Sequence, residues 1–226
     1  MSTDADILKS LSDLIVRDGE SVRLRRSQYI VRRGERPQSL FLIREGWAAR
    51  YRILRDGRRH ISQFYTPGDV CDSSWLLSGE AGHSVLALTP LRAVALDREA
   101  AELRFGRDAE FSRRVASESL SRLEAQAEWM VTLGCKSARE RLGQLILVLY
   151  LRLERAGRAA DLRCEFPLSQ QHLADFTGMT AVHVCRTLRG LRREQLADVH
   201  GRKLSILDFP ALARASSFES GYLACA

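Results

Sequence analysis

The sequence predicts an α+β fold with three parts: an N-terminal antiparallel β-roll (a jelly roll), a long helix, and a C-terminal winged helix-turn-helix. Three observations predict it. Short apolar-polar alternations with glycine turns run from about Glu20 to Asp97, a heptad pattern of apolar and small residues follows, and two short amphipathic segments flank Gly178. Apolar residues that recur every second position favour strands, and apolar residues that recur about every 3.5 positions favour helices. The chain is therefore expected to change from β-strands to α-helices along its length.

The N-terminal segment predicts a short amphipathic helix over residues 4–17. The segment contains early acidic residues and lacks the apolar core of a signal peptide. The longest apolar run, Leu145 to Leu151, is too short to span a bilayer. We therefore expect a cytoplasmic protein with no membrane partner. The apolar residues of the N-terminal helix are Ile7, Leu8, Leu11, Leu14 and Ile15.

Residues 20–97 predict a small antiparallel barrel or jelly roll, because segments such as QYIVRRGE and SLFLIREG alternate apolar and polar residues. A cupin enzyme would share this architecture, but a cupin metal site needs clustered histidines. Only His60 and His83 fall in this region, and their separation matches no metal-ligand motif. We expect no bound metal and no cofactor. Turn signals stand at Gly34, Gly46, Gly57 and Gly68.

The five cysteines do not predict a disulfide or metal framework. They are odd in number and include no C-x-x-C pair, which argues against disulfides and against a structural zinc site. No cysteine precedes Cys71, so the N-terminal cysteine group that an iron–sulfur cluster would need is missing. We expect reduced thiols at Cys71, Cys135, Cys164, Cys185 and Cys225.

A long helix is predicted from about Arg107 to Gly134. Small and apolar residues recur there at spacings of four and three, a heptad seam that lets two helices approach closely. This pattern favours a dimerisation helix, and the alternative is a helix whose apolar stripe packs against the β-roll of its own chain. Gly134-Cys135-Lys136 marks the hinge, and another amphipathic helix runs from Ser137 to about Ala156. The seam residues are Ala116, Leu120, Leu123, Ala127, Met130 and Gly134.

A helix-turn-helix follows a polar loop. Ser169 and Thr180 are expected to be N-caps, because a side-chain oxygen there accepts an amide proton of the following first turn. The first helix is predicted over residues 170–177, and Gly178 ends it as a C-cap or tight turn. The second helix is predicted over residues 181–193.

The second helix has a basic face, with no acidic residue from Phe176 to Arg193, and such a face suits a phosphate-lined groove. After it, LADVHGRKLSIL predicts two short strands that turn at His200-Gly201, a β-wing beside the helix. The net charge of +7 also favours a polyanionic partner, although a membrane surface would attract the same charge. An ordinary helical hairpin with a solvated basic face is the plainer alternative. The basic residues are His183, Arg186, Arg189, Arg192 and Arg193.

This helix-turn-helix and wing resemble the DNA-binding domain of the CRP/FNR family of bacterial transcription regulators. Gly34-Glu35, Gly46 and Gly68-Asp69, set around hydrophobic strands, are similar to the β-roll of the cyclic-nucleotide-binding domain over roughly Ser21 to Glu99. The resemblance implies four parts: a cyclic-nucleotide-binding-like sensor domain over 1–106, a dimerisation helix and hinge over 107–135, a winged helix-turn-helix domain over 136–215, and a tail over 216–226.

The chain departs from nucleotide-binding members of the family at the pocket. Those members hold the ribose with a Gly-Glu pair and the cyclic phosphate with an Arg-Ser pair, whereas the ungapped positions here are Asp72-Ser73 and His83-Ser84. A neutral histidine cannot supply the planar fork of arginine, and Asp72 would place a negative charge near a phosphate. We expect independence from cyclic AMP, with a pocket that takes an unknown small-molecule effector or is vestigial.

The resemblance implies a homodimeric, sequence-specific regulator that binds double-stranded DNA at a near-palindromic site. Arg186 aligns with the recognition arginine of the family and is the first candidate to contact guanine. Val182 stands where the best-known members carry a glutamate, so a thymine methyl becomes its natural contact. RNA polymerase is a further possible partner, because family members contact it through this domain. The candidate DNA-binding residues are Ser169, Thr180, Ala181, Val182, His183, Arg186 and Arg189.

Two other classes of function compete with a regulator. One is a small-molecule-binding module whose basic C-terminus mediates protein interactions. The other is an enzyme, which we do not expect because the sequence has no Gly-rich phosphate loop, no G-x-S-x-G motif and no recognisable acid pair.

Cys185 stands directly before Arg186 and is a candidate redox site. The arginine and the positive end of the helix favour its thiolate, whereas the plainer interpretation is a small packing residue. Under the redox interpretation, peroxide lowers the DNA affinity of the wild type but not that of Cys185→Ala.

Overall fold

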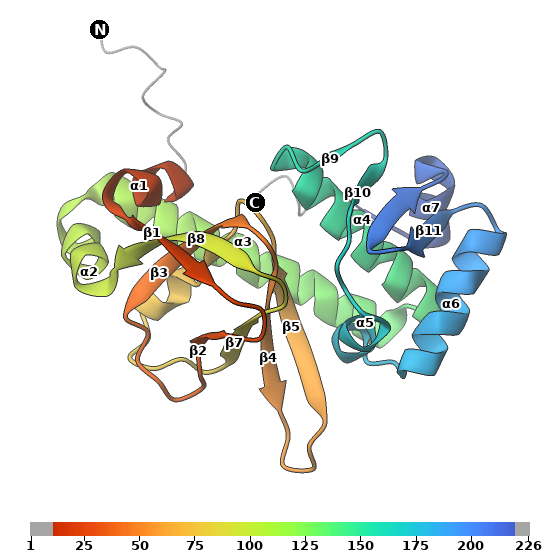
Figure 1. Ribbon diagram of the computed structural model, residues 1–226, viewed down its shortest axis with the longest axis horizontal. Helices are drawn as coiled ribbons and strands as arrows, with labels where there is room; N and C mark the ends of the chain where they lie inside the picture. Colours follow the sequence, from red (N-terminus) through yellow and green to blue (C-terminus); the bar gives the residue numbers. More distant parts are fainter. Residues whose placement is uncertain (1–10, 220–226) are drawn as a thin grey trace, which may run out of the picture. The chain divides into compact units, whose positions relative to one another are not determined.

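The computed structural model describes residues 11–219, which fall into two compact units. Within the described residues, the first unit contains residues 11–50 and Phe64–Leu120, and the second contains Tyr51–Gln63 and residues 121–219. Antiparallel sheets, one long helix and a C-terminal helix-turn-helix make up the structure (Figure 1). The predicted α+β fold class is confirmed.

Strands β1 to β8 form the β-roll as two four-stranded sheets, with orders β1-β8-β3-β6 and β2-β7-β4-β5. In the first sheet, β8 pairs antiparallel with β1 and β3, and β3 pairs antiparallel with β6. Ile43 from one sheet and Val85 from the other are fully buried in a common core with Tyr65. The strands are β1 (Glu20–Leu24), β2 (Tyr29–Val31), β3 (Ser39–Glu45), β4 (Ala48–Ile53), β5 (Arg59–Tyr65), β6 (Val70–Cys71), β7 (Ser84–Ala87) and β8 (Leu91–Asp97).

Gly46 shows why the predicted turns of the roll need glycine. Its φ is +85°, in the left-handed region, and a Cβ at this position would lie 2.3 Å from the carbonyl oxygen of Pro90. No side chain fits that space without moving backbone, so the turn between β3 and β4 depends on glycine.

Three helices pack against the sheet formed by β1, β8 and β3. They are α1 (Leu11–Asp18), α2 (Arg98–Arg107) and the beginning of α3 (Ala109–Cys135), and their buried side chains form a second core with that sheet. Residues 4–10 of the helix predicted over 4–17 lie outside the described residues. Helix α2 was not predicted, since the sequence interpretation starts the long helix at about residue 107 and assigns no helix to residues 98–106.

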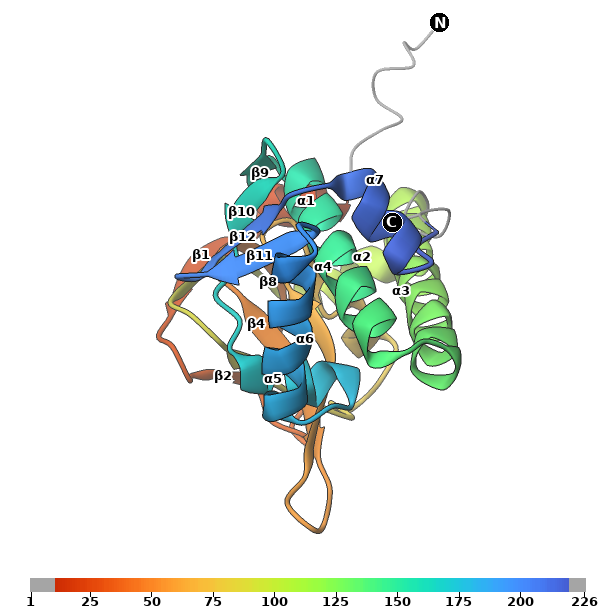
Figure 2. The ribbon, with the colours of Figure 1, turned by 90° about the vertical axis from the view of Figure 1, so that its right-hand side faces the viewer.

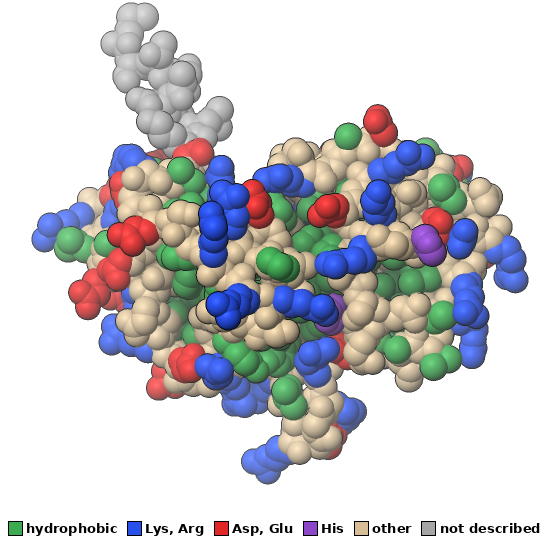
Figure 3. All heavy atoms as spheres, viewed as in Figure 1, with side chains coloured by type: hydrophobic (Ala, Val, Ile, Leu, Met, Phe, Trp, Pro, Cys, Tyr) green, Lys and Arg blue, Asp and Glu red, His purple; other side chains and the backbone are tan. Residues whose placement is uncertain are grey.

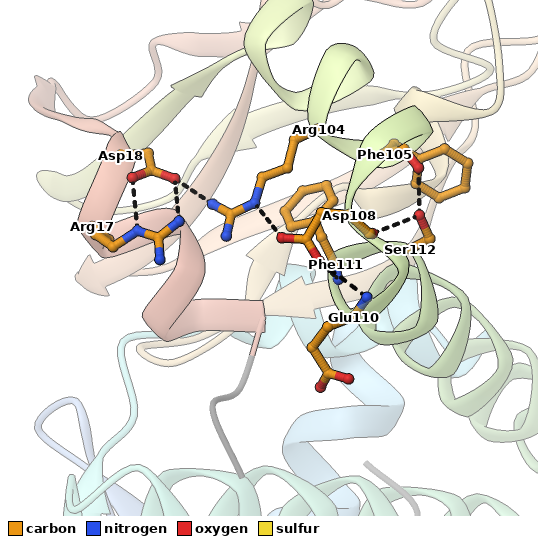
Figure 4. Close-up of polar contacts among 8 residues, drawn as sticks. All are labelled: Arg17, Asp18, Arg104, Phe105, Asp108, Glu110, Phe111 and Ser112. Carbon is orange, nitrogen blue, oxygen red and sulfur yellow. Dashed lines mark hydrogen bonds and ion pairs between the residues drawn. The ribbon is translucent and has the colours of Figure 1, made fainter. Parts of the chain in front are cut away.

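Asp108 separates α2 from α3. Its carboxylate accepts hydrogen bonds from the backbone N–H groups of Glu110 and Phe111, both at 3.0 Å, and from Arg104 Nε at 3.1 Å. Arg104 also forms an ion pair with Asp18 at the end of α1 (Figure 4). These contacts join the ends of the three helices.

The second unit is built on α4 (Ala138–Arg155), which contacts the helix-turn-helix formed by α5 (Gln170–Thr177) and α6 (Ala181–Arg193). Ser137 and Glu140 close a capping box at the start of α4. The segment expected to be a polar loop contains two short strands, β9 (Ala159–Ala160) and β10 (Arg163–Glu165), in a sheet of order β11-β12-β10-β9. The remaining elements are β11 (Ala197–His200), β12 (Lys203–Ile206) and α7 (Phe209–Ala215).

Candidate nucleic-acid interface

The two helices of the helix-turn-helix begin at the predicted caps. Ser169 Oγ accepts a hydrogen bond from the backbone N–H of His172 at 3.1 Å, and His172 Nδ1 accepts one from the backbone N–H of Ser169 at 3.2 Å. Thr180 Oγ1 caps α6 in the same way by accepting from the backbone N–H of His183 at 3.2 Å. Gly178 has a φ of +70° and ends α5, as a left-handed C-cap requires. Local chemistry therefore sets both ends of the turn.

The buried face of α6 holds it against α5, α4 and β11 (Figure 2). Val184 and Leu191 are fully buried, as is Leu173 on α5, and the small Ala174 lies at the same interface. Met179 and Leu188, two further large apolar residues of the helix-turn-helix, are half-buried. The core fixes the rotation of α6 about its axis, and the rotation decides which residues face solvent.

The exposed face of α6 carries the candidate DNA-contacting side chains. Val182 is 69% exposed, and His183, Arg186 and Arg189 are exposed beside it, whereas Ala181 is half-buried. The helix contains no acidic residue, and Lys and Arg side chains gather over it in the space-filling view (Figure 3). Neither Arg186 nor Arg189 forms an ion pair with another residue in the described range, so both guanidinium groups are available to a ligand.

The predicted wing is present beside α6. Strands β11 and β12 pair antiparallel, with His200 opposite Lys203, and the turn between them is Gly201-Arg202. Arg202 and Lys203 are exposed. Arg192 Nε of α6 lies 3.6 Å from Asp198 Oδ2 of β11, and this ion pair links the last turn of the helix to the wing.

The heptad seam of α3 is exposed. Leu123 is 62% exposed and Met130 is 68% exposed, while Phe111 and Val115 on the other side of the helix are fully buried in the roll. Leu120, which lies in the same unit as most of the roll, is 61% exposed, and this exposure does not fit an apolar stripe packed on the roll of its own chain. The other exposed seam residues are Ala116, Ala127 and Gly134.

The four candidate pocket residues of the roll differ in burial and in the contacts that they make within the roll. Asp72 and Ser73 are buried, and Asp72 forms an ion pair with Arg50 at 3.1 Å. Ser84 is half-buried, and its hydroxyl accepts a hydrogen bond from the backbone N–H of Arg33 at 3.1 Å. His83 is half-buried. The sequence interpretation missed Arg50, because no local pattern links it to a residue on another strand.

The described cysteines are free thiols. Cys185 is half-buried on α6, and its redox role stays a prediction. Burial raises the pKa of the Cys164 thiol to about 12, so this thiol is a packing residue. Among residues 11–219, no group of three His, Cys, Asp or Glu side chains could hold a metal ion. Within the same range, no helix is long and apolar enough to cross a membrane.

Comparison with protein families identifies both parts of the chain. Residues 21–103 match the cyclic nucleotide-binding domain, and residues 140–215 match the Crp-like helix-turn-helix domain. Both matches fall where the structure contains the β-roll and the helix-turn-helix.

Known proteins with similar sequences include the nitrogen fixation regulation protein FixK of Bradyrhizobium diazoefficiens. It is 33% identical over 75% of this chain and 70% of that relative. FixK of Azorhizobium caulinodans is 28% identical over 80% of this chain and 72% of that relative. The structure of FixK2 from Bradyrhizobium japonicum aligns with a TM-score of 0.81 and 24% identity over 89% of this chain and 98% of that one. The chain therefore belongs to the CRP/FNR family of DNA-binding transcription regulators.

Proposed function

We propose that this chain is a homodimer that binds a near-palindromic DNA site in a sequence-specific manner and regulates transcription in the cytoplasm. The observation that carries the proposal is the exposed face of α6. Arg186, whose guanidinium forms no ion pair within residues 11–219, projects there beside an exposed apolar side chain, Val182, on a helix without acidic residues. Arginine and an apolar side chain together can distinguish guanine from thymine in the major groove.

The exposed seam of α3 supports the homodimer. Large apolar side chains such as Leu123 and Met130 repeat along one face of a long helix, and a second copy of the same face would bury them. Two copies of α6 would then enter successive major grooves about 34 Å apart.

The interior of the roll supports independence from cyclic AMP. The pocket positions carry Asp72 and His83 in place of an arginine fork, and Asp72 is already paired with Arg50. A cyclic phosphate would meet a carboxylate at this place and would lack a free bidentate partner. A different small-molecule effector and a contact with RNA polymerase remain compatible with the exposed surfaces.

A selection for bound sequences from a random DNA library tests the proposal. The wild type is expected to enrich a palindromic operator, and Arg186→Ala is expected to lose about 1–3 kcal/mol per half-site on that operator while it keeps its affinity for random DNA. Arg193→Ala is the matched control, because it removes an equal charge from the last turn of the same helix. It is expected to weaken binding to all sequences alike.

Two outcomes contradict the proposal. Absence of any enriched sequence for the wild type favours a module whose basic C-terminus mediates protein interactions. An unchanged ratio of operator to random affinity in Arg186→Ala removes this residue from base recognition.

A further inference from the structure

Asp72 carries a buried carboxylate in the first unit, and only 2% of the residue is exposed. Its Oδ2 atom accepts hydrogen bonds from Arg50 Nη1 at 3.1 Å and from the Tyr65 hydroxyl at 3.0 Å. Its Oδ1 atom accepts from the backbone N–H of Ser74 at 3.2 Å and from the Ser74 hydroxyl at 2.9 Å. Both carboxylate oxygens of Asp72 therefore accept hydrogen bonds, and the negative charge compensates that of the largely buried Arg50 guanidinium.

The donors to this carboxylate come from separate parts of the roll. Arg50 lies in β4 and Tyr65 ends β5, whereas Asp72 follows β6 of the other sheet and caps the 3-10 helix η2 (Ser73–Leu76). Ser73 is fully buried, and its hydroxyl lies 3.4 Å from the hydroxyl of Ser119 on α3. The carboxylate therefore joins both sheets to the segment that contacts α3, within the stretch that carries the seam.

We propose that Asp72 is an internal ligand of the β-roll: its carboxylate fills the anion position of Arg50 and holds η2 against α3 without a small-molecule effector. The inference rests on the proposed function and supplies a physical cause for its independence from cyclic AMP. A buried guanidinium without an anion is strongly destabilising, so a roll built around Arg50 needs a negative charge at this place. In this chain the negative charge belongs to the Asp72 side chain, so no effector has to supply it. DNA binding is therefore constitutive.

An internal ligand can be replaced by a free one. Asp72→Ala removes the carboxylate and leaves a space of its size beside Arg50 and Tyr65. Formate, a planar carboxylate with two acceptor oxygens, can occupy that space and accept the same hydrogen bonds. The variant becomes a regulator whose DNA binding depends on formate.

The experiment measures operator affinity and Tm in sodium formate and in sodium chloride at equal ionic strength. In chloride, Asp72→Ala is expected to bind the operator roughly tenfold or more weakly than the wild type, because the buried Arg50 guanidinium loses its ion pair with this carboxylate. Formate restores most of that loss and raises the Tm of the variant. The double variant Asp72→Ala/Arg50→Met lacks the Arg50 guanidinium that would bind formate, and it gains nothing from formate. Glu45→Ala is the matched control, because it breaks an exposed pair with Arg92 in the same roll, and it behaves like the wild type in both salts.

Two results overturn the inference. One is that Asp72→Ala binds the operator in chloride as tightly as the wild type does. The other is that formate raises the operator affinity of the double variant as much as that of Asp72→Ala. If Asp72→Ala does not fold, Asp72→Asn carries the test, because it keeps the side-chain shape and loses the charge. Its operator affinity is expected to fall in both salts, and unchanged affinity contradicts the inference. The Tm separates this inference from the proposed function, since formate stabilises Asp72→Ala whether or not the protein binds DNA.

Discussion

At the scale of single residues, α6 combines a charged and an apolar candidate contact. Val182 leaves most of its side chain in water, although Val184, two residues further on, is fully buried. Burying the exposed apolar surface of a helix against a partner is favourable, because that surface is removed from water. Arg186 lies one turn further along the same exposed face and can donate two hydrogen bonds to guanine. The two side chains are therefore suited to contact neighbouring base pairs.

Replacing thymine by uracil in the operator tests the role of Val182. Removal of the thymine methyl at one position in each half-site is expected to cost the wild type about 0.8 kcal/mol per half-site, roughly fourfold in affinity, because one methyl contact is lost. Val182→Ser, which has no apolar tip, is expected to bind thymine and uracil operators equally. Competition binding of the two DNAs measures the difference, and a wild type that is indifferent to uracil at every thymine excludes this contact.

At the scale of elements, the junction of α1, α2 and α3 depends on carboxylates held in their charged form. Asp108 caps α3, and its pKa lies below its ordinary value of 3.8 because it accepts hydrogen bonds from the Phe111 backbone N–H and from Arg104. The pKa of Asp18 is lowered chiefly by its hydrogen bond with Arg17. Both carboxylates belong to one chain of contacts around Arg104.

Acid is therefore expected to weaken this junction. A carboxyl whose pKa is depressed in the folded protein contributes stability above its unfolded pKa and loses that contribution as the pH falls through the folded pKa. The Tm of the wild type is expected to drop between about pH 5 and pH 3, and Asp108→Asn, which keeps the cap but not the charge, is expected to show a shallower drop.

Asp97→Asn is the matched control for the acid experiment, because Asp97 caps α2 by accepting from the Ala100 backbone N–H at 3.0 Å. Asp97 has no arginine partner within residues 11–219. Thermal unfolding at a series of pH values compares the three proteins. A Tm profile of Asp108→Asn that is parallel to the wild-type profile would show that the ion pair with Arg104 contributes nothing.

At the scale of the whole molecule, the exposed seam of α3 decides whether the protein binds DNA with one recognition helix or with two. Its large apolar side chains are arranged along one face, so a single copy leaves a continuous apolar stripe in water. Linking two half-site contacts in one dimer raises affinity well beyond that of either contact.

Leu123→Glu/Met130→Glu is expected to yield monomers, because like charges would meet in an apolar interface. Operator affinity is expected to fall by roughly a hundredfold or more, since the second half-site contact is lost. Leu77→Glu/Leu103→Glu is the matched control, because both leucines are exposed to a similar degree but lie on η2's C-cap and on α2. Light scattering measures the mass of each variant. If the seam variant stays dimeric, the interface lies elsewhere.

The features that the sequence predicted well are those set by residues close together in the chain. Ser169, Gly178 and Thr180 specify the ends of α5 and α6 through bonds within three or four residues, so the helix-turn-helix could be placed to the residue. The alternation of apolar and polar residues likewise indicated the strands of the roll, because side-chain direction alternates along any strand. Helix α2 was missed because its sequence, REAAELRFGR, has only a weak apolar periodicity.

The sequence by itself thus determined the fold class, the family and the helix that presents Arg186. Only the tertiary structure decided that the α3 seam is exposed, and that Asp72 meets Arg50, 22 residues away in the chain, and Tyr65 of β5. The physical reason is that burial and charge compensation depend on which strands and helices come together. A carboxylate that looks like an obstacle to a phosphate in the sequence is, in the folded roll, the partner of a buried arginine.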